Sequence, residues 1–185
     1  MFDSSTVEHH GFQKFCDFAE ESSSEDMNEM LHETFMREAI ALSRSNVREG
    51  TGGPFAALIV RDGVVLARGT NLVTSTNDPT AHAEMVAIRQ ACNVLGSYQL
   101  EGCELYTTCE PCPMCLGAIY WARPRAVYYA NSRDDAASIG FDDRFIYDEF
   151  PLSPDKRKMP MSQILRDEAA VAFREWKESS TKTPY

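Results

Sequence analysis

The chain has 185 residues, of which 43% are hydrophobic and 25% are charged, a composition typical of one soluble globular domain. Its formal net charge of −10 argues against a protein that binds nucleic-acid backbones through a basic patch, so we expect a free small molecule as its ligand. The sequence contains no run of about 18 apolar residues and no basic segment followed by an apolar one. We therefore expect neither a membrane span nor a secretory signal.

The first 48 residues divide into two parts. Residues 1–26 are rich in serine and in acidic residues, which predicts a mobile extension, with a docked helix as the alternative. From residue 27 to about residue 48, apolar residues recur at steps of three and four, which predicts an amphipathic helix. The folded domain is therefore expected to span residues 27–185.

Two strands are expected next. A glycine-rich run over residues 50–54 breaks the helix, and it lacks the spacing of a phosphate-binding loop. The continuous apolar run 55–60 predicts a buried strand, and an Asp-Gly pair then predicts a hairpin turn into a second strand over residues 64–73. Asn71 lies near the end of that strand and is either a turn residue or a substrate contact.

A second helix is predicted to end at Gly96. Either Asp78 or Thr80 is expected to be its N-cap, because Asp and Thr side chains accept hydrogen bonds from the first free backbone N–H groups of a helix. His82 and Glu84 then lie in the first turn or just after it.

A strand over residues 103–108 is followed by a third helix. Pro113 is well suited to its first position, which makes Cys112 the expected N-cap and places Cys115 in the first turn. Two predicted helices thus begin with residues that can bind a metal ion.

The remaining chain predicts a strand over residues 125–130, a short helix over 134–139 and a final amphipathic helix over about 165–176. Residues 145–150 are apolar and compatible with either a helix or a strand. Because strands alternate with helices, the expected class is α/β, with helices on both faces of one sheet.

The sequence predicts one zinc site. A catalytic zinc ion takes three protein ligands and keeps a fourth position open, and His82, Cys112 and Cys115 supply one imidazole and two thiolates. The positive end of a helix dipole stabilises thiolates at a helix start. The open position takes water, whose pKa zinc lowers to about 7 in the most favourable cases. Glu84, two residues after His82, is expected to shuttle protons between this water and the substrate.

Other interpretations of these residues exist. Cys109, Cys112 and Cys115 together are compatible with a structural Cys3His zinc site or with an iron–sulfur site. Cys109 ends a predicted strand, so we expect its side chain to point elsewhere. His82 alone would more often be a core histidine, and Glu84 alone a solvated helix residue. Their combination with the two cysteines favours the catalytic interpretation.

Cysteine usage indicates the compartment. The chain has six cysteines, three of them within seven residues, and this uneven spacing favours metal binding over a disulfide framework. A reducing compartment is therefore expected, which places the protein in the cytoplasm.

The metal-site residues follow the pattern H-x-E and P-C-x-x-C, which is typical of zinc nucleobase deaminases. Beyond this pattern, residues 27–185 resemble the guanine deaminases of the cytidine-deaminase-like superfamily. The resemblance includes the runs at residues 52–55, 77–84, 109–124 and 140–143, together with the C-terminal Tyr185. The residues 1–26 have no counterpart in it.

The resemblance implies a three-layer α/β/α sandwich around a mixed five-stranded sheet, of which the sequence pattern itself indicates only four strands. It also implies a homodimer in which C-terminal segments are exchanged, so that Tyr185 covers the partner's active site. The residues that it assigns to the base pocket are Phe55, Asn71, Ala83, Trp121 and Asp143. Core packing is the alternative role for both Phe55 and Trp121, and helix capping is the alternative for Asp143.

The predicted function is therefore hydrolytic deamination of guanine to xanthine and ammonia, with one zinc ion per subunit. Three alternatives remain. Guanosine is the substrate if the pocket admits a ribose. A tRNA adenosine deaminase is disfavoured by the acidic chain and by the Gly-Phe-Asp-Asp run. A non-catalytic zinc module, from a different functional class, requires no proton shuttle at Glu84.

Overall fold

The computed structural model describes residues 24–184. Most of the predicted extension and also Tyr185 therefore lie outside the described residues. The chain divides into two compact units, one ending at Asp143 and the other beginning at Arg144. All strands of the described residues belong to the first unit.

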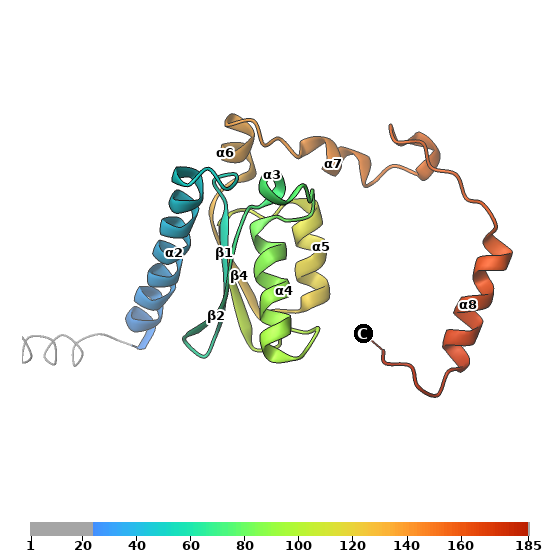
Figure 1. The fold of residues 1–185 in the computed structure, drawn as a ribbon, viewed down its shortest axis with the longest axis horizontal. Coiled ribbons are helices and arrows are strands. Elements are labelled where there is room, and N and C mark those ends of the chain that lie inside the picture. Colours follow the sequence, from blue (N-terminus) through green and yellow to red (C-terminus); the bar gives the residue numbers. More distant parts are fainter. Residues whose placement is uncertain (1–23, 185) are drawn as a thin grey trace, which may run out of the picture. The chain divides into compact units, whose positions relative to one another are not determined.

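The first unit is built around one four-stranded mixed sheet (Figure 1). Its elements in chain order are α2 (Ser24–Arg48), β1 (Ala56–Arg61), β2 (Val64–Thr70), α3 (Val73–Thr76), α4 (Ala83–Leu95), β3 (Cys103–Cys109), α5 (Pro113–Ala122), β4 (Ala126–Asn131) and α6 (Arg133–Ser138). The strand order is β2-β1-β3-β4. β1 is antiparallel to both of its neighbours, and β3 and β4 are parallel.

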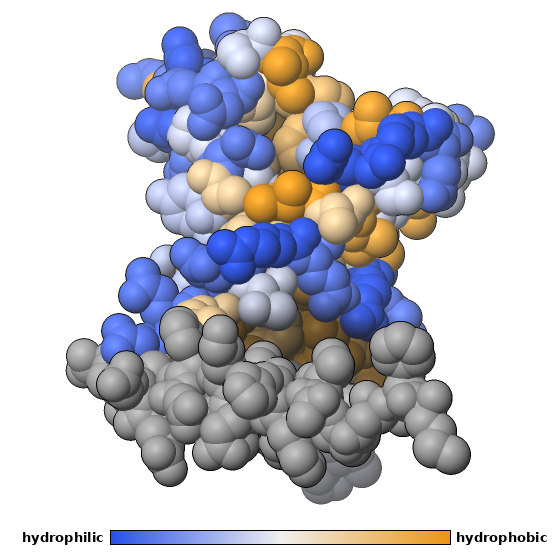
Figure 2. Space-filling model, turned by 90° about the vertical axis from the view of Figure 1, so that its left-hand side faces the viewer, coloured by the Kyte–Doolittle hydropathy of each residue, from blue (hydrophilic) through white to orange (hydrophobic). Residues whose placement is uncertain are grey.

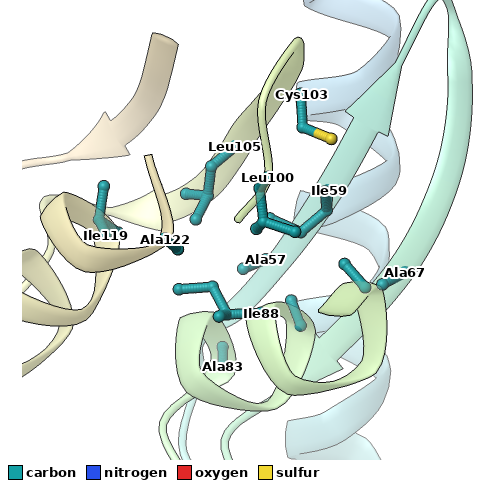
Figure 3. Packing of buried hydrophobic residues seen from close by; sticks show 12 residues of the cluster. Ala57, Ile59, Ala67, Ala83, Ile88, Leu100, Cys103, Leu105, Ile119 and Ala122 are labelled. Carbon is teal, nitrogen blue, oxygen red and sulfur yellow. The ribbon is translucent and has the colours of Figure 1, made fainter. Parts of the chain in front are cut away.

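Helices cover both faces of the sheet, as the sequence predicts for the α/β class. Side chains of β1 alternate between the faces. Ala57 and Ile59 join a buried cluster with residues of β3, α4 and α5 (Figure 3), whereas Leu58 and Val60 pack with Phe35 of α2. The central strand β1 is buried on both sides, which explains its continuous apolar sequence.

The prediction of a fifth strand is wrong for residues 24–184, where the sheet has four strands. After β4 the chain turns at once into α6, because Ser132 and Asp135 form a capping box. Asp135 Oδ2 accepts a hydrogen bond from Ser132 N at 2.8 Å, and Ser132 Oγ accepts one from Asp135 N at 3.2 Å. The ambiguous apolar segment that follows is helical, as α7 (Arg144–Glu149).

The predicted N-caps of the second helix are also wrong. Asp78 Oδ1 accepts hydrogen bonds from the backbone N (2.8 Å) and the Oγ1 (2.7 Å) of Thr80, so Asp78 closes a turn of its own before the helix. Helix α4 instead begins at Ala83 with His82 as its N-cap. The preceding strand β2 stops at Thr70, short of the predicted residue 73, because residues 73–76 form α3.

The second unit contains α7, a short 3₁₀ helix (Pro154–Lys156) and α8 (Arg166–Glu178), which confirms the predicted final helix. α8 buries none of its residues, and Phe173 is 80% exposed. Exposed hydrophobic side chains also occur elsewhere, and the face drawn in Figure 2 has several of them, in orange, among hydrophilic ones. Within residues 24–184 no helix combines the length and the hydropathy that crossing a bilayer requires.

A glycine of β2 controls how closely the sheet approaches α4. A Cβ atom at Gly69 would lie 2.1 Å from the carbonyl oxygen of Ala83 and 2.6 Å from the backbone N of Ala87. We therefore expect Gly69→Ala to destabilise the fold by about 1–3 kcal/mol, because the first turns of α4 must shift. Denaturant unfolding of the purified variant measures this free energy. Gly117→Ala, whose added Cβ meets no atom within 4 Å outside its own helix, should match or exceed the wild-type stability. Equal stability of Gly69→Ala and wild type would contradict the prediction.

Candidate metal centre and active site

Two helix N-termini bring the predicted metal ligands together. His82 is the N-cap of α4, and Cys112 is the N-cap of α5 with Pro113 in the first turn, as predicted for the latter helix. Neither side chain caps its own helix. They point toward each other instead, with Cys112 Sγ at 3.5 Å and Cys115 Sγ at 3.6 Å from His82 Nδ1.

These three side chains fit a zinc ion. A tetrahedral ion with ordinary Zn–N and Zn–S bond lengths holds nitrogen and sulfur ligands about 3.6 Å apart, close to both measured separations. The candidate ligand atoms of His82, Cys112 and Cys115 all lie within 4.8 Å of one another. Three protein ligands leave one tetrahedral position for water or substrate, as in catalytic zinc sites.

The two cysteines differ in their affinity for protons. Hydrogen bonds from Cys115 and from His82 lower the pKa of Cys112 to about 4, although burial opposes the shift, so its sulfur is a thiolate at neutral pH. The hydrogen bond between the two cysteines raises the pKa of Cys115, so Cys115 keeps the proton that the two sulfurs share. Binding of a divalent ion displaces that proton, because thiolates and not thiols ligate metals.

Glu84 lies beside the metal ligands. Its side chain is in the first turn of α4 and is only 6% exposed. Cys115 Sγ donates a hydrogen bond to Oε2 at 3.5 Å, and Thr107 Oγ1 donates one to Oε1 at 3.2 Å. Burial raises the pKa of the Glu84 carboxyl, which makes it a better proton acceptor than an exposed carboxylate. This is the environment that a general acid–base residue requires.

Cys109 does not belong to this cluster. Its thiol donates to the backbone oxygen of Ser132 at 3.6 Å, and burial raises its pKa to about 11. Among the described residues the one group of side chains suited to a metal ion is His82, Cys112 and Cys115. As expected, Cys109 points elsewhere, and the geometry does not support a Cys3His site.

Some of the predicted pocket residues lie close to one another. Asn71 N donates to Phe55 O at 3.1 Å, which joins the end of β2 to the start of β1. The ring of Phe55 makes an edge-to-face contact with Phe141, with the ring centroids 4.9 Å apart. Ala83, between His82 and Glu84, is completely buried. Asn71 is 6% exposed, and its Oδ1 accepts from Val73 N at 3.3 Å.

The other pocket residues are placed differently. Asp143 is half-buried, and its pKa is raised by burial and by the negative charge of Cys112, which places its carboxyl in the electric field of the metal ligands. Trp121 lies in the last turn of α5 and is 64% exposed, so it is not part of the core. Tyr185 lies outside the described residues. Binding of a purine by any of these residues stays a prediction.

Sequence reasoning missed two buried polar residues near the site. Thr107 donates a hydrogen bond to the Glu84 carboxylate. In the sequence it is noticeable only as a polar residue within the buried strand β3. Asn46 lies in the last turn of α2 and donates to the backbone oxygens of Gly53 and Asn71. No local pattern distinguishes it from a solvated helix residue, because its partners are distant in sequence.

Comparison with known proteins agrees with this geometry. Residues 29–131 match the family described as the cytidine and deoxycytidylate deaminase zinc-binding region. The guanine deaminase of Bacillus subtilis (strain 168) is 54% identical over 156 residues, which cover 84% of this chain and 100% of that protein. The X-ray structure of guanine deaminase from Bacillus subtilis superposes with a TM-score of 0.81 at 55% identity, covering 83% of this chain and 98% of that one.

The similarity extends to related deaminases. The tRNA-specific adenosine deaminase of Agrobacterium fabrum is 42% identical over 119 residues, covering 64% of this chain and 76% of that protein. The family match includes all three candidate metal ligands and Glu84. The chain therefore belongs to the cytidine and deoxycytidylate deaminase family of zinc-binding proteins.

Proposed function

We propose that this chain catalyses the hydrolytic deamination of guanine to xanthine and ammonia, as a zinc enzyme of purine catabolism or salvage. The observation that carries the proposal is the buried Glu84 carboxylate beside the triangle of His82, Cys112 and Cys115. The substrate is supported by the identity to the Bacillus subtilis guanine deaminase, which extends over that protein's full length.

His82 Nδ1 and the sulfurs of Cys112 and Cys115 would hold the zinc ion. When bound, zinc acts as a Lewis acid that lowers the pKa of water and so makes a nucleophile available near neutral pH. Glu84 accepts a proton from the water that attacks C2 of guanine and transfers it to a ring nitrogen. Glu84 then takes the remaining proton from the new C2 hydroxyl and gives it to the amine, so that the C2–N bond breaks, the C2 carbonyl forms and ammonia leaves. Thr107 holds one carboxylate oxygen during these transfers.

The base is recognised by residues outside the metal centre. Phe55 and Trp121 present aromatic faces on which a purine stacks. Asn71 both donates and accepts hydrogen bonds, and Asp143 accepts from N–H groups of guanine. Within the part of the chain that the structure describes, Nδ2 of Asn71 has no acceptor, which supports a role in ligand binding.

Substrate choice is tested by incubating the purified protein with guanine, guanosine, cytosine and adenine and measuring ammonia. We expect turnover of guanine and much slower turnover of the others, because the pocket residues match the edge of guanine. If the protein releases ammonia from guanosine and not from guanine, the substrate is the nucleoside. If it releases ammonia from none of the four compounds, a non-catalytic zinc module is favoured. A tRNA substrate is disfavoured by the net charge of −10, which repels a polynucleotide.

We also infer a homodimer that exchanges C-terminal segments. α8 exposes the hydrophobic side chains of Val171, Phe173 and Trp176, and burial of such side chains against a second copy is favourable. Light scattering should give twice the chain mass, and a monomer would refute the exchange.

The thiolate ligands require a reducing compartment, so we place the enzyme in the cytoplasm.

The C-terminal tail is expected to act as a lid over the active site. Deletion of residues 183–185 should lower kcat at least ~10-fold with the zinc content unchanged, because water then enters the site during the reaction. Steady-state ammonia release and metal analysis measure both quantities. The substitution Lys182→Ala, just before the deleted residues, is the matched control and should behave like wild type. Full activity of the truncated protein would refute a catalytic tail.

A further inference from the structure

Asn46 is a buried polar side chain that none of the proposed chemistry uses. It lies in the last turn of α2 and is only 3% exposed. Its Nδ2 donates hydrogen bonds to Gly53 O at 2.9 Å and to Asn71 O at 3.0 Å, and Thr51 Oγ1 donates to its Oδ1. One amide group thus joins α2, the glycine-rich loop and the chain that leaves β2.

The orientation of this amide is determined by its partners. Both hydrogens of Nδ2 point to backbone carbonyl oxygens, and Oδ1 faces a hydroxyl. The reversed orientation would place Oδ1 against the oxygens of Gly53 and Asn71, with no hydrogen between them. Because buried polar groups are costly when they lack partners, this arrangement is strongly preferred over any alternative.

Asn71 is also confined from the side of the glycine-rich loop. A Cβ atom at Gly52 would lie 1.9 Å from the carbonyl oxygen of Asn71 and 3.2 Å from Asn46 Nδ2. The loop therefore passes directly against this carbonyl, which only glycine permits. The backbone N of Asn71 in turn donates to Phe55 O at 3.1 Å. Contacts on both sides of the peptide unit hold Asn71, and through it Phe55.

We infer that Asn46 is a positioning residue that sets the backbone of Asn71 and Phe55, and thereby the affinity of the site for its purine base. The inference rests on the proposed function, which assigns both residues to the base pocket. Asn46 lies on α2, whereas the metal ligands and Glu84 lie on α4 and α5. Loss of its hydrogen bonds should therefore weaken substrate binding and leave the metal and the proton shuttle in place.

Two substitutions separate this role from simple packing. Asn46→Asp keeps the size and shape of the side chain but removes both donors, and Asn46→Ala removes the whole amide. In both variants the carbonyl of Asn71 loses its partner, and a displacement of Asn71 by a fraction of an ångström is expected to raise KM for guanine about 10-fold or more. We expect kcat to fall less than KM rises, with full zinc content.

The matched control is Leu42→Ala. Leu42 lies one turn earlier in α2 and packs in the apolar cluster under that helix, so its truncation lowers stability without touching Asn71. KM, kcat, zinc content and melting temperature are measured for all variants at one temperature below every transition. The expected result is a raised KM in both Asn46 variants and a wild-type KM in Leu42→Ala.

Two outcomes would overturn the inference. An unchanged KM in both Asn46 variants would show that Asn71 does not depend on this amide. An equal rise of KM in Leu42→Ala would show that any loosening of α2 has the same effect. Wild-type protein in the same assay separates failure of the inference about Asn46 from failure of the proposed function. If wild-type protein does not turn over guanine, the proposed function is refuted together with the inference.

Discussion

Replacement of Glu84 by glutamine should lower kcat for guanine deamination by about 10²–10⁴-fold or more and leave zinc bound. Glutamine has the shape of glutamate, and its side-chain oxygen still accepts the hydrogen bond from Thr107. An amide cannot take up and release protons near neutral pH, however, so every proton transfer of the reaction loses its carrier. Ammonia release under saturating guanine gives kcat, and metal analysis of the same sample gives the zinc content.

The matched control is Glu104→Gln. Glu104 is another buried carboxylate, 8% exposed on β3, and it accepts hydrogen bonds from Tyr106 and Arg125. Its replacement should lower stability and leave kcat within a few-fold of wild type. Near-normal activity of Glu84→Gln would exclude this residue as the proton shuttle. With zinc still bound, that result would be expected of a non-catalytic zinc module.

Loss of the metal should abolish activity and lower the melting temperature. The zinc ligands come from the starts of α4 and α5, so the ion ties two helices together. Zinc at about 1,000 times its dissociation constant contributes about 4 kcal/mol. For a chain of this size the removal of that energy lowers the melting temperature by about 10 °C. Dialysis against a chelator, followed by calorimetry and by readdition of zinc, tests this expectation.

Single substitutions test which cysteines hold the ion. Cys115→Ala removes a fully buried ligand and should give a zinc-free, inactive protein that readdition of zinc does not restore. Cys109→Ala removes a thiol that bonds to Ser132 outside the cluster, so it should keep both zinc and activity. Loss of zinc in Cys109→Ala would instead support the Cys3His site that the spacing alone also permits.

Much of the metal centre was predictable from local sequence. The spacing of Cys112 and Cys115 across a helix start, with Pro113 between them, determines where the two sulfurs lie relative to one helix. The predictions failed where side chains had two possible partners. Asp78 is as suitable for a turn as for a helix N-cap. Because its carboxylate accepts hydrogen bonds from Thr80, Asp78 closes a turn, and α4 begins later than predicted, at Ala83. The fifth strand failed for a similar reason, because a capping box directs the chain after β4 into a helix.

The sequence by itself predicted the candidate metal ligands, the order of helices and strands in the first unit except for α3, and the class of chemistry. These features depend on residue type and on short spacing, which are readable without knowledge of distant contacts. The tertiary structure alone decided that Thr107 holds Glu84 and that Asn46 holds Asn71. Both bonds join residues more than 20 positions apart in the sequence. Such partners meet only when helices pack on a sheet, so no local pattern predicts them.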